Sequence, residues 1–115
     1  MIKDLSVIQK TYDLIVWYIP IIERSPRTHR FTVGDKIVNN LYELLEGLIE
    51  ARYTQNKREK LQAMSIKLDV LRHQAQLLLD FALIDHKQYQ YVNKLMNEVG
   101  VELGGWIKQQ ESKSL

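Results

Sequence analysis

The sequence contains no cysteine and only two prolines, and neither glycine nor proline occurs between Leu48 and Val99. Without cysteine, disulfides, thiolate metal sites and cysteine nucleophiles are all excluded. The long interval without glycine or proline favours helices, because these two residues disfavour a helix most strongly. One straight helix over that interval would be about 78 Å long at ~1.5 Å per residue, so the chain must fold back on itself.

Long apolar runs are also missing. The longest, Leu14 to Ile22, contains Pro20 and is too short to span a bilayer about 30 Å thick. The first residues alternate charged and apolar side chains, which is not the pattern of a signal peptide. The formal net charge is +2 over 115 residues, and 45% of the residues are hydrophobic. We therefore expect one soluble, cytoplasmic domain over residues 1–115, without membrane association.

The strongest pattern lies between Leu61 and Ala82, where apolar residues recur at alternating steps of three and four. This spacing is typical of a helix that packs lengthwise against other helices. Similar patterns precede and follow it, and together they predict an all-α protein, an antiparallel up-down-up-down four-helix bundle. The expected helices cover residues 5–23, 33–53, 57–83 and 86–109. The expected core stripe of the first helix is Leu5, Ile8, Tyr12, Ile15, Ile19 and Ile22.

Local signals predict where these helices begin and end. Pro20 should kink the first helix or end it early, because proline lacks the backbone donor. Thr32 opens a capping pattern before the second helix. Asn56 is a good N-cap for the third helix, and Asp85 with Gln88 forms a capping box for the fourth.

A basic segment connects the first two expected helices. It contains Arg24, Arg27, His29 and Arg30 and no acidic residue. In an antiparallel bundle it shares one end with the turn at Asp85, while both termini lie at the other end. Guanidinium groups bind phosphate oxygens through paired hydrogen bonds. These four residues are therefore candidate nucleic-acid contacts, and a solvated polar loop is the alternative.

Two further cations, Lys67 and Arg72, border the core stripe of the third expected helix. They could form a basic face along that helix and extend the candidate nucleic-acid site. The alternative is that they form ion pairs with Asp69 or with a glutamate of the second helix.

The first helix is apolar on all sides near its end, and such a helix must be covered on all sides. In a small bundle a second subunit can provide that cover. The residues that we assign to a subunit interface are Val16, Trp17, Tyr18, Ile21 and Trp106.

Several kinds of catalytic chemistry find no support in the sequence. Di-iron bundles need a Glu-x-x-His pair on two helices, and none of the three histidines has a glutamate three residues before it. No glycine-rich phosphate loop is present. We therefore expect a protein that is not an enzyme and has no catalytic residues, metal or cofactor.

Four motifs occur in a familiar order: Tyr18-Ile19-Pro20, Pro26-Arg27 with His29, Leu71-Arg72, and Leu103-Gly104-Gly105-Trp106-Ile107. In this the chain resembles the accessory variability determinant (Avd) proteins of diversity-generating retroelements. Those proteins belong to a four-helix-bundle family related to the ribosomal-RNA intervening-sequence proteins. The resemblance covers roughly residues 12–108.

The resemblance implies a non-enzymatic partner of the element's reverse transcriptase that binds RNA and DNA and supports mutagenic cDNA synthesis. It also implies a homopentamer with a basic surface, in which Arg72 is the basic residue of the third helix and Arg27 the arginine that follows the proline. Such binding would be directed at phosphates and would depend steeply on salt. The alternative is an oligomeric protein-interaction scaffold of the same bundle family without nucleic-acid binding.

Overall fold

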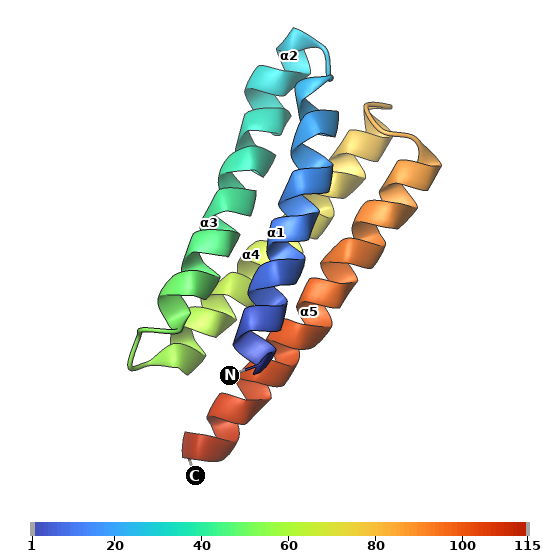
Figure 1. The fold of residues 1–115 in the computed structure, drawn as a ribbon. Helices are drawn as coiled ribbons and strands as arrows, with labels where there is room; N and C mark the ends of the chain where they lie inside the picture. The colour runs from blue at the N-terminus through green and yellow to red at the C-terminus, as the bar shows by residue number, and fades with distance from the viewer. Residues whose placement is uncertain (1, 115) are drawn as a thin grey trace.

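Four long helices run antiparallel in the computed structural model, which describes residues 2–114 and the side chains of residues 4–112 (Figure 1). They are α1 (Ile2–Glu23), α3 (Asp35–Ala51), α4 (Lys57–Asp80) and α5 (His86–Ser114). A short helix, α2 (Arg27–His29), and a π-helical turn, η1 (Arg30–Gly34), lead into α3. Residues 2–114 contain no strand. The predicted all-α four-helix bundle is confirmed.

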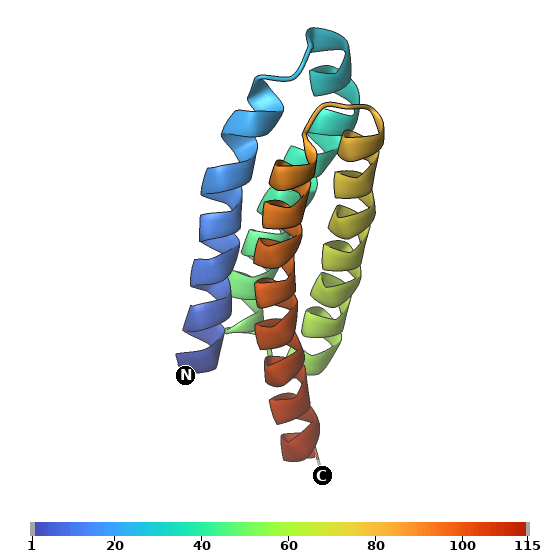
Figure 2. The ribbon, with the colours of Figure 1, turned by 90° about the vertical axis from the view of Figure 1, so that its right-hand side faces the viewer.

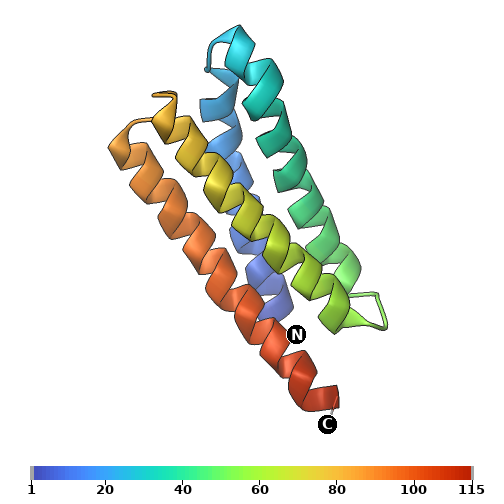
Figure 3. The ribbon, with the colours of Figure 1, turned by 180° about the vertical axis from the view of Figure 1, so that it is seen from behind.

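The bundle is a rod of 49 × 23 × 19 Å. Helices α1 and α4 each pack against both α3 and α5, as the up-down-up-down topology requires. Figures 2 and 3 show the two labelled ends of the chain at one end of the rod, together with the turn between α3 and α4. The α1–α2 connection and the α4–α5 turn lie at the opposite end. Within the described residues, no helix is long and apolar enough to cross a membrane.

The predicted core stripe of α4 is buried almost completely. Its six buried members are Leu61, Met64, Leu68, Leu71, Ala75 and Leu78. The seventh, Ala82, is exposed, because α4 ends at Asp80 and Ala82 adopts a positive φ of 58° in the following turn. A residue in this left-handed conformation cannot continue a right-handed helix.

Helix α1 buries only part of the expected stripe: Ile15 and Ile22 are buried, and Ile8 and Ile19 are half-buried. Leu5 and Tyr12 are 51% and 55% exposed. The side chains that face the core include Val7, Thr11, Leu14, Ile15, Tyr18 and Ile22. The Thr11 hydroxyl donates to the Val7 carbonyl at 2.8 Å, so this polar group is buried without losing a hydrogen bond.

Two residues assigned to a subunit interface need correction. Tyr18 is 0% exposed and Trp106 is 2% exposed within a single chain. Both therefore belong to the core of the bundle, because their own helices and neighbours already cover them. Neither offers a surface to another subunit.

Several predicted helix ends also change. Helix α1 begins earlier than expected, at Ile2, and continues through Pro20 to Glu23, the last residue of its predicted range, so Pro20 does not end the helix early; Pro20 lies on the exposed side, where water can replace the missing bond. Thr32 does not cap a helix, because helical backbone begins at Arg27 and the Thr32 hydroxyl donates to the Thr28 and His29 carbonyls. Helix α5 extends to Ser114, beyond the expected end at residue 109.

Two predicted caps are confirmed. The Asn56 side chain accepts from the Glu59 backbone amide at 3.5 Å, at the start of α4. At the start of α5, Asp85 accepts from the Gln88 amide at 2.8 Å, and the Gln88 side chain accepts from the Asp85 amide at 2.9 Å. This reciprocal pair is a capping box.

Candidate nucleic-acid interface

One end of the rod carries the basic segment predicted from sequence. We call this end the tip and define it as residues 24–34 with residues 81–85, that is, the α1–α2 connection, α2, η1 and the α4–α5 turn (Figure 1). Arg24, Arg27, His29 and Arg30 all lie here. The expected loop is shorter than predicted, because only residues 24–26 lie between α1 and α2.

The arginines of the tip have no acidic partner in the described part of the chain. The guanidinium carbons of Arg27 and Arg30 lie 5.6 and 5.1 Å from the centre of the Phe31 ring, within cation–π range. Arg30 also donates from Nη1 to the Glu23 carbonyl at 3.1 Å. Their positive charges are therefore not neutralised by neighbouring carboxylates.

The other three arginines differ in this respect. Arg52 Nε lies 3.2 Å from Asp4, Arg58 Nε lies 3.6 Å from Glu111, and Arg72 Nη1 lies 3.9 Å from Asp69. Each of these cations has a carboxylate beside it that competes with an external phosphate. Unpaired guanidinium charge is thus a property of the tip.

His29 lies beside the arginines and is half-buried. Its ring centre is 5.7 Å from that of Phe81, which belongs to the α4–α5 turn. Its Nδ1 atom is buried and has no hydrogen-bond partner among the described residues. The histidine therefore joins the two chain segments that form the tip.

Lys67 and Arg72 lie in the body of α4 and not at the tip. Lys67 Nζ lies 2.7 Å from the Glu43 carboxylate of α3, so the alternative interpretation, an ion pair with the second long helix, is confirmed for this residue. The Arg72 guanidinium packs over Gly100 of α5, where a Cβ atom would lie 2.6 Å from Nη2. Arg72 is partly exposed and remains the less constrained of the two.

Sequence reasoning missed two aromatic residues of the tip. Phe31 and Phe81 are 57% and 51% exposed, and they are the only phenylalanines in the chain. The signal available in the sequence was a phenylalanine directly after Arg30 in the basic segment. An aromatic side chain among arginines is typical of surfaces that bind nucleic acids.

The other residues predicted to form a subunit interface lie on α1. Val16 is 57% exposed, while Trp17 and Ile21 are half-buried. The Trp17 ring centre lies 5.0 Å from that of Tyr91 on α5, so the tryptophan is partly covered within its own chain.

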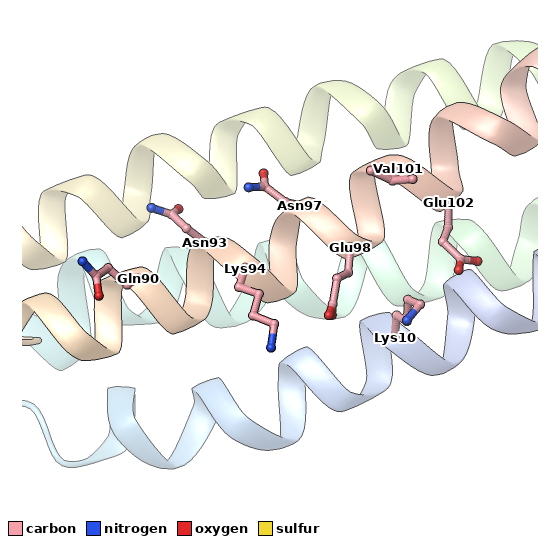
Figure 4. Close-up of a pocket in the computed structure, with 8 residues that line it drawn as sticks. All are labelled: Lys10, Gln90, Asn93, Lys94, Asn97, Glu98, Val101 and Glu102. Atoms are coloured by element: carbon pink, nitrogen blue, oxygen red, sulfur yellow. The ribbon is translucent and has the colours of Figure 1, made fainter.

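A shallow groove follows the outer side of α5 beside α1 (Figure 4). Its charged lining residues are Lys10, Lys94, Glu98 and Glu102, and Figure 4 shows both glutamates directed toward α1. Two cations and two anions balance each other, so this groove has no net charge that would attract phosphate. The unpaired positive charge that could attract a nucleic acid therefore lies at the tip.

The fold and the tip define a small antiparallel helical bundle with a basic end. A family model described as bAvd-like matches residues 5–110, and the chain belongs to that family. This result confirms the resemblance to the accessory variability determinant proteins. Comparison with curated protein sequences finds no match.

Among solved structures, the bundle is similar to a protein of unknown function from the S23 ribosomal protein family of Bacteroides thetaiotaomicron. The two chains superpose with a TM-score of 0.83 and are 20% identical. The match covers 92% of this chain and 98% of the other. At that identity the similarity shows a shared fold.

Proposed function

We propose that this protein is a non-enzymatic, nucleic-acid-binding accessory protein that associates with the reverse transcriptase of a retroelement and supports mutagenic cDNA synthesis. Membership of the bAvd-like family supports the proposal. The observation that carries it is the tip, where Arg24, Arg27 and Arg30 face solvent or an aromatic ring and have no carboxylate beside them in the described structure.

The physical basis of the proposed binding is phosphate neutralisation. Each phosphate bound by a lysine or arginine releases condensed counterions, so the affinity falls steeply with salt. Contacts of this kind position a nucleic acid but do not read its sequence. Sequence choice would then come from the reverse transcriptase or from base pairing.

Arg72 extends the proposed surface along α4. Its ionic contact with Asp69 is long at 3.9 Å, so a phosphate can compete for the guanidinium. Lys67 contributes less, because binding a phosphate would require it to leave Glu43 at 2.7 Å. We expect the tip arginines to dominate, followed by Arg72.

We further propose that the protein acts as a homo-oligomer, a pentamer by family resemblance. Exposed apolar side chains on two neighbouring helices support self-association. They are Leu5, Tyr12 and Val16 on α1 and Tyr42 and Ile49 on α3. Symmetry would repeat the tip around a shared axis and add its positive fields together. The same apolar residues favour the alternative, an oligomeric interaction scaffold without nucleic-acid binding.

The test of nucleic-acid binding combines a double variant with a matched control. Arg24→Gln with Arg27→Gln removes two charges from the tip. Arg58→Gln with Lys60→Gln removes two charges from the other end, where each cation has a glutamate partner. Binding to a short single-stranded RNA and to a duplex is measured by fluorescence anisotropy over a salt series.

For the single strand, the plot of log K against log salt should be less steep for the tip variant than for the wild type. The negative slope should shrink in magnitude by about 1.4, at ~0.7 per lost phosphate contact. The control should leave the slope unchanged. Equal slopes for the wild type and the tip variant would place the phosphate contacts elsewhere. Absence of binding by the wild type would favour the scaffold alternative.

The partner is tested by co-purification with a retroelement reverse transcriptase, and by the yield and error content of cDNA with and without the protein. Light scattering at several concentrations tests self-association. A protein that stays monomeric would contradict the oligomer proposal.

A further inference from the structure

We infer that the tip binds unpaired nucleotides, whose bases stack on Phe31 and Phe81 while the neighbouring arginines hold the phosphates. This inference rests on the proposed nucleic-acid binding and adds the class of ligand, single-stranded RNA or DNA. Duplexes keep their bases stacked inside the helix, so they could use only the arginines.

The first argument is the exposure of the two rings. Single exposed apolar residues are common on protein surfaces and need no explanation. Here, however, both phenylalanines of the chain lie at the same end of a rod that is 49 Å long, and each is more than half exposed. Neither ring is part of the buried core of the bundle.

The second argument is the backbone at both positions. Phe31 belongs to the π-helical turn η1, a rare conformation that is frequent at functional sites. Phe81 follows α4 and precedes Ala82, whose φ of 58° is one that side chains other than glycine rarely adopt. Hydrogen bonds from Ala82 N to the Leu79 carbonyl at 2.9 Å and from Leu83 N to the Leu78 carbonyl at 2.8 Å hold this turn. Irregular backbone thus presents both rings to solvent.

The third argument is the arrangement of cations around the rings. Arg27 and Arg30 lie against Phe31, and His29 lies 5.7 Å from Phe81. Rings on which bases can stack therefore lie next to cations that can bind phosphates, and proteins that bind single strands combine these two features. Stacking tolerates any base, because every base has a π face.

The test uses the full chain and replaces each ring by leucine, in Phe31→Leu and Phe81→Leu. The probes are a single-stranded RNA, a single-stranded DNA of the same sequence and the corresponding duplex. Each variant should weaken single-strand binding roughly tenfold, the effect of losing one stacked base. Duplex binding and the salt slope should not change.

The matched control is Tyr53→Leu. Tyr53 is 78% exposed at the other end of the rod and has Arg52 5.6 Å from its ring centre, but that arginine is paired with Asp4. The Tyr53→Leu variant should therefore bind single strands as well as the wild type does. Phe31→Tyr and Phe81→Tyr retain aromatic faces and should retain single-strand affinity, which separates stacking from a loss of folding. A 2-aminopurine in the strand should be quenched by the wild type and less by the leucine variants.

Two negative results can be distinguished. Equal affinity for single strand and duplex, with no effect of either leucine substitution but a loss in Arg24→Gln with Arg27→Gln, would overturn the stacking inference and leave the proposed function standing. No binding to any probe would overturn both. Preference for the RNA or the DNA strand identifies the source of the unpaired nucleotides.

Discussion

Replacing Tyr18 with phenylalanine should stabilise the protein. The ring is fully buried in the core, and its hydroxyl finds no hydrogen-bond partner among the described residues. A buried donor without a partner costs about 1–3 kcal/mol, because the group loses its water on folding and gains nothing in return. The variant keeps the ring and removes only the hydroxyl. We therefore expect the free energy of unfolding to rise by about 1–2 kcal/mol.

The same residue predicts a pH dependence. Burial raises the pKa of Tyr18 well above its usual value, because the ionised form is poorly solvated. Above a pH of about 10 the unfolded chain loses this proton while the folded chain keeps it. Wild-type stability should then fall by up to about 1.4 kcal/mol per pH unit from this group alone. The variant lacks this contribution, so its advantage should widen as the pH rises past 10.

Urea unfolding followed by circular dichroism, at pH 7 and at a pH of about 10.5, measures both effects. Tyr12→Phe is the control, because Tyr12 is 55% exposed and its hydroxyl reaches solvent. A Tyr18→Phe protein less stable than the wild type, with the same pH dependence, would show that the hydroxyl is hydrogen-bonded. The reasoning from an unpaired buried donor would then fail.

Three further substitutions test the packing and capping of the bundle, each by chemical denaturation. Asp85→Ala should lower the free energy of unfolding by about 0.5–2 kcal/mol, because it removes the capping box of α5; an unchanged value would mean that the cap is dispensable. Gly100→Ala should raise it by up to about 1 kcal/mol through helix propensity, because the one close contact of the new Cβ is with the flexible end of Arg72. Gly47→Ala should lower it by about 1–3 kcal/mol, because the new Cβ meets Met64 inside the core. Opposite signs at the two glycines are the critical result, and equal signs would refute the contact argument.

Much of the fold follows from local patterns. In α4 the alternating three and four spacing leaves one possible buried face, and that face is buried. In α1 the run from Leu14 to Ile22 is apolar on every side, so two stripes compete and the neighbouring helices decide between them. Tyr18 therefore entered the core although the expected stripe excluded it. A sequence pattern cannot resolve that choice, because the packing of α3 and α5 determines it.

Part of the candidate site could likewise be predicted from the sequence, and part could not. Topology alone predicts that the arginines of the α1–α2 connection share one end with the α4–α5 turn, and they do. The exposure of Phe31 and Phe81 depends on a π-helical turn and on the positive φ of Ala82. Neither backbone feature could be predicted from the residue types at these positions. The pairing of Lys67 with Glu43 depends on the register between two helices.

The first turn of α1 and the last turn of α5 both lie at the end of the rod opposite the tip (Figure 3). A purification tag, a fluorophore or a bead attached through either terminus would therefore leave Arg27 and Phe31 pointing into free solution. Immobilised protein should therefore capture a single-stranded nucleic acid as well as dissolved protein does.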